Sequence, residues 1–265
     1  MSPDLIIIQL FLHVSFIKTI SYSKIIGFYV ILEIQRGKMQ NLNEDFNTAL
    51  NIYENDYSHK DLIEFLKNGS VAQKQASVLK LDSLKTLEDA KVLMQNLTGC
   101  DGKIREAVSF RLPEFVSANP EYFLSFEDIF LDAIIDINGN ICRNTISAIV
   151  YLKYNKDFCT GFCAKLAKRT LELSKIASAF DPQDGKYKVN KEIFKLYWYL
   201  ETIYNFAEQI DKSMLKDIIS ETKGIRDYTI REKTAKVLSK LSNYSDFSAI
   251  SNELKKDENY YVRRI

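Results

Sequence analysis

Apolar positions recur with the same helical spacing in three segments of the chain. Residues 104–112, 142–150 and 230–238 share one order: apolar, Arg, two variable residues, Val/Ile/Thr, Ser/Ala, two variable residues, aliphatic. Positions i, i+4 and i+8 lie on one face of an α-helix, and the small residue beside that face lets a neighbouring helix approach closely. The pattern therefore predicts three amphipathic helices of one kind.

Weaker copies of this helix begin at Val71 and Val189, which lack the Arg, and a last copy begins with Val262-Arg263. The first apolar positions stand at residues 71, 104, 142, 189, 230 and 262, a spacing that holds two helices and their loops. Other apolar stripes precede four of the copies, at residues 62–66, 87–97, 126–134 and 214–219. We therefore expect helix pairs that must stack to bury their apolar faces.

Helix starts should be marked by side chains that accept hydrogen bonds from free backbone N–H groups. Such residues stand three positions before four of the copies: Asn68, Asp101, Asp227 and Asn259. We predict that these four residues are helix N-caps.

The repeated units resemble the HEAT-repeat family of armadillo-like helical repeats. In that family the second helix opens with Asp, a few residues, then Val-Arg and small residues, and Asp257-Glu-Asn-Tyr-Tyr-Val262-Arg263 is the best match. The resemblance covers residues 60–265, with departures in the two copies without Arg and in a long, aromatic fourth unit. It implies an all-α, right-handed α-solenoid of stacked antiparallel helix pairs, about five in residues 39–265, with the last repeat incomplete. Such solenoids commonly act as protein-interaction scaffolds.

Residues 1–38 differ in character from the rest. Two apolar runs between Leu5 and Ile34 are interrupted by Lys18 and Lys24, which fits neither a signal peptide nor a membrane span well. Residues 36–38, Arg-Gly-Lys, can be encoded by a sequence that resembles a bacterial ribosome-binding site just ahead of Met39. We therefore expect Met39 to be the true start, and the alternative is a membrane anchor.

Composition agrees with a helical fold. The chain has 9 Gly and 4 Pro, where average usage would give roughly 18 and 13, so it has little use for hairpins or glycine-rich phosphate loops. With 46% hydrophobic residues it is not disordered. Its net charge of +1 lacks the basic excess of a nucleic-acid-binding domain. The 4 cysteines are too scattered for a disulfide scaffold, which favours reduced thiols in a cytoplasmic protein.

The repeated arginines are the first candidate binding residues. Arg105, Arg143 and Arg231, with Arg263, stand at one position of the repeat. They could form a row of cations for an acidic partner. The alternative is that each Arg pairs with an Asp near a helix start and ties adjacent repeats together, as the resemblance also implies. We favour this structural role, in which the pairs maintain register more than they add stability.

Charge and aromatic residues supply further candidates. Residues 112–142 contain acidic but no basic residues, whereas residues 143–200 are mainly basic and include Lys188 and Lys191. The two blocks could form a bipolar binding surface, or they are solvated helix faces. Trp198 lies in an aromatic run, residues 194–206, that could anchor a partner or stack on bases. Core packing is the favoured alternative for this run.

No motif for catalysis or metal binding stands out. Cys159 and Cys163 are spaced like two ligands on one helix face, but zinc needs two more, and His59 is the only histidine after Met39. Nucleophile-elbow, Walker and dinucleotide motifs are absent from the sequence. We predict no catalytic residue, metal or cofactor.

The favoured function is therefore a non-enzymatic scaffold that binds a protein or peptide partner in a bacterial cytoplasm. The alternative is a nucleic-acid binder or enzyme resembling the helical-repeat glycosylases that act on alkylated DNA. A third possibility is a membrane-tethered scaffold, which requires that residues 1–38 are translated.

Overall fold

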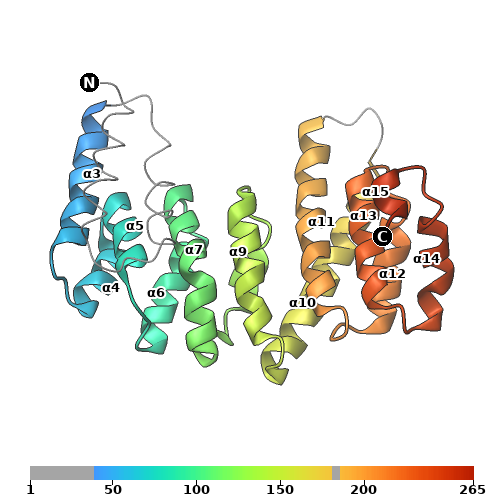
Figure 1. Ribbon diagram of the computed structural model, residues 1–265, viewed down its shortest axis with the longest axis horizontal. Coiled ribbons are helices and arrows are strands. Elements are labelled where there is room, and N and C mark those ends of the chain that lie inside the picture. Colours follow the sequence, from blue (N-terminus) through green and yellow to red (C-terminus); the bar gives the residue numbers. More distant parts are fainter. Residues whose placement is uncertain (1–38, 181–185) are drawn as a thin grey trace. The chain divides into compact units, whose positions relative to one another are not determined.

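The protein is helical throughout the part that the structure describes (Figure 1). The computed structural model describes residues 39–180 and 186–265, with the side chains of residues 44–180 and 189–265, and these ranges contain helices and no strand. The prediction of an all-α protein is confirmed for these residues. None of the described helices combines the length and the apolar character that a membrane span requires. The expected start at Met39 and the alternative anchor concern residues 1–38, which lie outside the described residues.

The chain divides into two compact units, residues 1–80 and 81–265. The first contains α3 (Met39–Glu54), α4 (His59–Asn68) and α5 (Val71–Lys80), and α5 packs against both other helices. Lys80 Nζ donates to the backbone carbonyls of Ile52 and Asn55 at 2.7 and 2.6 Å. It thereby satisfies carbonyl groups at the C-terminal end of α3, which have no partner within that helix.

The second unit contains ten α-helices and three short 3₁₀-helices among its described residues. These are α6 (Leu87–Leu97), α7 (Gly102–Ala118), η1 (Pro120–Phe123), α8 (Glu127–Ala133), α9 (Gly139–Ile149), η2 (Val150–Leu152), α10 (Lys156–Ser178), α11 (Lys186–Phe206), α12 (Lys212–Thr222), α13 (Tyr228–Lys240), η3 (Ser245–Phe247), α14 (Ser248–Leu254) and α15 (Tyr260–Arg263). Every helix that the apolar spacing predicts is present, and the long fourth unit corresponds to α10 and α11.

Helix contacts in the second unit follow the order of the chain. Helices that are adjacent in sequence contact each other: α6 with α7, α8 with α9, α10 with α11, and α12 with α13. Helices two places apart also make contact, namely α6 with α8, α8 with α10 and α10 with α12 in one series, and α7 with α9, α11 with α13 and α13 with α15 in the other. Most described helices of this unit therefore pack against both a helix that is next to them in sequence and a helix two places away.

Three of the four predicted N-caps are confirmed. Asp101 accepts from the backbone N–H groups of Lys103 and Ile104 at 2.8 and 3.1 Å, and Asp227 and Asn259 cap α13 and α15 in the same way.

The prediction for Asn68 is wrong, because Asn68 ends α4. Ser70 starts α5 instead, with reciprocal hydrogen bonds to Gln73. The spacing also missed Asn138, whose side chain accepts from the backbone of Asn140 at the start of α9.

The predicted apolar faces form the core. Ile104, Cys142 and Ile230, the first positions of the three strong copies, are all buried. Val150 is an exception at 37% exposed, because α9 ends at Ile149 and a 3₁₀ turn moves the next residue off the buried face.

A chain of aromatic rings joins α8, α10 and α11 in this core. Successive ring centroids from Phe130 through Phe158 and Phe162 to Phe206 are 6.0, 5.1 and 5.3 Å apart.

Candidate functional site

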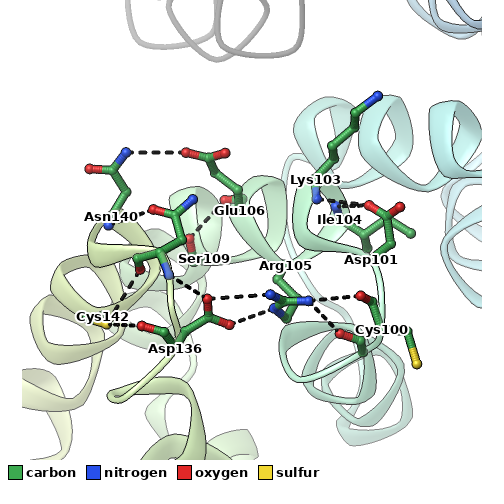
Figure 2. Close-up of polar contacts among 12 residues, drawn as sticks. Cys100, Asp101, Lys103, Ile104, Arg105, Glu106, Ser109, Asp136, Asn140 and Cys142 are labelled. Carbon is green, nitrogen blue, oxygen red and sulfur yellow. Dashed lines mark hydrogen bonds and ion pairs between the residues drawn. The ribbon is translucent and has the colours of Figure 1, made fainter. Parts of the chain in front are cut away.

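Arg105, in the first turn of α7, links two helices through its guanidinium group (Figure 2). Its Nε donates to Oδ2 of Asp136 at 2.6 Å, and its Nη1 donates to the backbone carbonyls of Gly99 and Cys100 at 2.9 and 3.1 Å. Asp136 stands two residues before Asn138, the N-cap of α9, and accepts its backbone N–H at 2.8 Å. One carboxylate therefore holds both an arginine of α7 and the segment that starts α9.

Arg231 in α13 repeats this arrangement with the same atoms. Its Nε donates to Oδ2 of Asp257 at 2.7 Å, and its Nη1 donates to the carbonyls of Ile225 and Arg226 at 3.0 and 2.8 Å. Asp257 stands two residues before Asn259, the N-cap of α15, and accepts its backbone N–H at 2.8 Å. We call this arrangement the arginine clamp: Nη1 binds the carbonyls six and five residues earlier, and Nε binds the Asp ahead of a contacting helix.

Both clamps are largely shielded from water. The side chains of Arg105 and Asp136 are 16% and 10% exposed, and those of Arg231 and Asp257 are 10% and 9% exposed. The hydrogen bond from Arg231 lowers the pKa of Asp257, and the bond to Asp257 raises the pKa of Arg231. Each partner thus stabilises the charged form of the other, so the pair is ionised at neutral pH.

The clamps correspond to the structural role considered for the repeated arginines. Arg105 ties α7 to the segment before α9, and Arg231 ties α13 to the segment before α15, so both guanidinium groups are engaged within the chain. Arg143 differs, because it is exposed and its Nη1 donates to Oδ1 of Asn140 on its own helix at 3.1 Å. The segment before α11, residues 181–185, lies outside the described residues.

The remaining candidate residues all belong to α11. Lys191 is exposed, and the side chain of Lys188 lies outside the described residues. Trp198 is 8% exposed, with the rings of Phe194 and Tyr197 edge-on to it at 6.1 and 5.3 Å. Trp198 is therefore packed in the core, as the favoured alternative for the aromatic run predicted. Its ring is too little exposed to anchor a partner at the surface.

The acidic and basic blocks of the sequence meet between α8 and α10. Lys165 lies 2.9 Å from a carboxylate oxygen of Glu127 and 2.6 Å from one of Asp128. Arg169 pairs with Asp128 at 2.9 Å and with Asp132 at 2.7 Å. The hydrogen bond from Lys165 lowers the pKa of Asp128. Charges that the sequence separates into two blocks thus neutralise one another across this helix contact.

A cluster of exposed aromatic side chains was missed by the sequence analysis. Tyr228, Tyr260 and Tyr261 are 40%, 58% and 49% exposed, and the ring of Tyr228 stacks on that of Tyr261 at 6.1 Å. The guanidinium of Arg264 lies 4.9 Å from the centre of the Tyr261 ring. We call Tyr228, Tyr260, Tyr261 and Arg264 the tyrosine patch. Its only signal in the sequence is the Tyr-Tyr-Val-Arg-Arg run, which the repeat alignment explains as a helix start.

The paired cysteines belong to the core. The sulfur atoms of Cys159 and Cys163 are 3.5 Å apart and both residues are buried. Burial, together with the neighbouring thiol, raises the pKa of Cys163. Within the described residues no group of three or more His, Cys, Asp or Glu side chains is arranged to hold a metal ion. The two thiols serve here as small apolar side chains.

No family model matches the chain, and neither a curated protein sequence nor a solved structure is significantly similar to it.

Proposed function

We propose that this chain is a HEAT-like, right-handed α-solenoid that acts as a non-enzymatic scaffold for a protein or peptide partner. The observation that carries the proposal is the arginine clamp, which occurs at Arg105 and at Arg231 with the same donor atoms and the same carbonyl spacing. A bond of one kind, made between successive contacting helices, is what a repeat array needs to keep its units in register.

The pattern of helix contacts supports a repeat array. Each described helix of the second unit contacts a sequence neighbour or a helix two places away. The helices α6, α8, α10 and α12 contact one another in this order, as do α7 with α9 and, separately, α11, α13 and α15. Stacked antiparallel helix pairs would produce this pattern, because each pair buries its apolar face only against the next pair.

The tyrosine patch supports binding of a protein. Tyr and Arg are enriched among the residues that contribute most to protein interfaces, since they bury a large area and still donate hydrogen bonds. Arg143 and Lys191 add exposed positive charge. The partner that fits these groups carries acidic side chains beside an apolar surface.

A cytoplasmic location agrees with the cysteines. All four are free thiols, and the reducing cytoplasm keeps thiols in this state.

Capture experiments with the full chain test the proposal. A bait with an N-terminal affinity tag is incubated with a lysate of the native cells, and bound proteins are identified by mass spectrometry. We expect a specific partner whose recovery falls about ten-fold with Tyr260→Ala/Tyr261→Ala. Tyr154→Ala is the matched control, because Tyr154 is 88% exposed and lies outside the tyrosine patch.

The same preparation distinguishes the nucleic-acid alternative. Gel-shift titrations with duplex DNA at two salt concentrations should show no saturable binding. Tight DNA binding that weakens steeply with salt, together with no captured protein, would contradict the scaffold proposal.

A further inference from the structure

The helix contacts of the second unit divide it into two stacks. In one, α7 packs on α6 and α9, and α8 packs on α9; in the other, α10 packs on α11 and α12, and α11 packs on α13. Within the described residues, packing between the two groups is largely confined to α8 against α10, because α9 packs along neither α10 nor α11. We call the two groups the α6–α9 stack and the α10–α15 stack.

The chain crosses from one stack to the other through residues 153–155. Leu152, the last residue of η2, is fully buried, and Phe158 in the first turn of α10 is also buried. Between them, Tyr154 is 88% exposed, and the backbone N–H groups of Lys153 and Asn155 donate to carbonyls of the same turn. A short, exposed segment of this kind can absorb the backbone rotation that a change of angle between two rigid parts requires.

A few side chains form a pivot for such a rotation. The rings of Phe130 in α8 and Phe158 in α10 meet edge-on at 6.0 Å. Tyr199 in α11 donates its hydroxyl to the carbonyl of Leu131 at 3.5 Å. The stacks therefore meet at a few points, in contrast to α7 and α9, which pack along each other.

Ion pairs hold the solvent-exposed side of the same helix contact. We call them the ion-pair latch, which consists of Lys165 and Arg169 of α10 with Glu127, Asp128 and Asp132 of α8. The side chains of Asp128 and Asp132 are 58% and 60% exposed, so dissolved ions reach these pairs and screen them. One exposed pair contributes little alone, whereas several pairs on one contact act together and are weakened together by salt.

We propose that the α8–α10 contact is a hinge between two rigid stacks, and that the ion-pair latch holds this hinge in the conformation of the structure. When the latch is screened or its charges are reversed, the stacks rotate about the pivot and the angle between them varies. The inference concerns motion within the chain and does not rest on the proposed scaffold function, so either one can fail without the other.

Distances between spin labels on the two stacks measure the hinge. Labels are attached through Ser117→Cys in α7 and Ser220→Cys in α12, both at exposed positions, in a full chain that carries Cys100→Ser. The other three cysteines are buried in the folded protein. The control pair, Ser220→Cys and Ser239→Cys in α13, lies within the α10–α15 stack. Double electron–electron resonance gives the distance distribution of each pair.

Salt should loosen the hinge without loosening either stack. For the pair at positions 117 and 220, the distribution at about 20 mM salt should widen about two-fold or more at about 500 mM, because the shorter Debye length screens the exposed ion pairs. The control pair at positions 220 and 239 should keep its width and its mean distance.

Charge reversal tests whether the latch causes this effect. Lys165→Glu with Arg169→Glu should produce the wide distribution already at low salt, because like charges then face each other across α8 and α10. Adding Asp128→Lys and Asp132→Lys should narrow the distribution again, since opposite charges are restored.

The matched control for charge is Lys168→Glu with Lys175→Glu. Both lysines are exposed on α10 and form no ion pair in the described residues, so this variant should retain the wild-type distribution. Circular dichroism confirms that each variant is folded.

The hinge is overturned if the pair at positions 117 and 220 has the same distribution at both salt concentrations. Equal widening of the control pair also overturns it, because salt then loosens the fold as a whole. Widening by salt without an effect of the Lys165 and Arg169 changes removes the latch as the cause. If the charge-reversed variants do not fold, the salt dependence of the wild-type latch decides between these outcomes.

Discussion

The carboxylates of Asp136 and Asp257 each accept two kinds of donor, a guanidinium from one helix and a backbone N–H from the start of another. This double use depends on the arginine fork, which presents several N–H groups in a fixed plane. A lysine at the same position could not bind two carbonyls and a carboxylate with comparable geometry.

A double-mutant cycle at Arg231 and Asp257 measures the strength of one clamp. Either Arg231→Gln or Asp257→Asn should lower the free energy of unfolding by about 2 kcal/mol, because each leaves a shielded charge without its partner. The double variant should lose less than the sum of the singles. Urea unfolding provides the values. Lys91→Gln, at an ion pair whose side chains are 48% and 72% exposed, is the control and should cost less than about 0.5 kcal/mol. Equal effects at the two pairs would exclude a special role for the clamp.

The ion pair between Arg231 and Asp257 should make the free energy of unfolding depend on pH. Arg231 lowers the pKa of Asp257 below its ordinary value of 3.8, so protonation is easier in the unfolded chain. The contribution of Asp257 to stability is therefore complete above about pH 4 and is lost as pH falls through the folded pKa. The difference in unfolding free energy between wild type and Asp257→Asn should be the same at about pH 7 and pH 5 and should shrink below about pH 4. If this difference between wild type and Asp257→Asn stays constant until acid unfolds the protein, the ion pair does not stabilise the fold through the charge of Asp257.

Thiol accessibility supplies an independent check on residue burial. Cys100 is exposed, whereas Cys142, Cys159 and Cys163 are buried, and burial raises the pKa of Cys142 to about 12. Reaction with a chromogenic disulfide reagent should modify one thiol rapidly in the folded protein and all four in urea. The Cys100→Ser variant should lose the rapid phase. Rapid modification of two or more thiols would show that the core opens readily.

At the scale of single elements, the sequence predicts where helices lie along the chain better than it predicts which side chains are exposed. The i, i+4, i+8 spacing located α7, α9 and α13, and it did so because the same residues form the buried face of each helix. It gave no helix for 39–54, where α3 lies, since that segment has no strong copy of the repeat.

The sequence predicted that the repeated arginines pair with aspartates, but not which aspartates they bind. The sequence suggested an Asp near a helix start, yet it could not select Asp136 or Asp257, which stand 31 and 26 residues beyond their arginines. That choice depends on how the helices pack. The tyrosine patch escaped prediction for the same reason, because side-chain exposure is decided by packing.

The contact between α8 and α10 provides a test at this scale. Gly161 lies inside α10, and a Cβ atom there would come within 2.9 Å of the Glu127 Cδ. In a Glu127→Ala background, Gly161→Ala should stabilise the protein by about 1 kcal/mol, the usual gain of Ala over Gly within a helix. With Glu127 present the gain should be smaller, because the carboxylate must leave Lys165. Identical gains measured by thermal unfolding in both backgrounds would contradict the close approach.

At the scale of the whole molecule, each of the two compact units has its own buried residues. Leu66 is fully buried in the first unit, and Leu166 is fully buried in the second, which also contains Trp198, the only tryptophan. The units are therefore expected to unfold with separate cooperativity.

Urea unfolding with two probes tests this expectation. Leu66→Ala should lower the stability of the first unit by about 2 to 5 kcal/mol. The change should be visible by circular dichroism, while the Trp198 fluorescence transition stays near its original midpoint. Leu166→Ala should shift the fluorescence transition instead. A single shift of both signals by Leu66→Ala would mean that the chain unfolds as one cooperative unit.

The bonds of Arg263 to its own backbone have an entropic consequence for the clamps. An arginine loses about 2 kcal/mol of rotamer freedom when it is held in one geometry, and this loss is one reason why most surface ion pairs add little stability. Nη1 of Arg263 in α15 makes the same two carbonyl bonds, to Asp257 and Glu258, without pairing to a carboxylate of the described residues, so the local turn alone orders its side chain. By the same geometry, Arg105 and Arg231 are ordered before their aspartates arrive. The pairing step is then spared that entropy loss, and each clamp can hold its helices more tightly than a salt bridge between two freely rotating side chains.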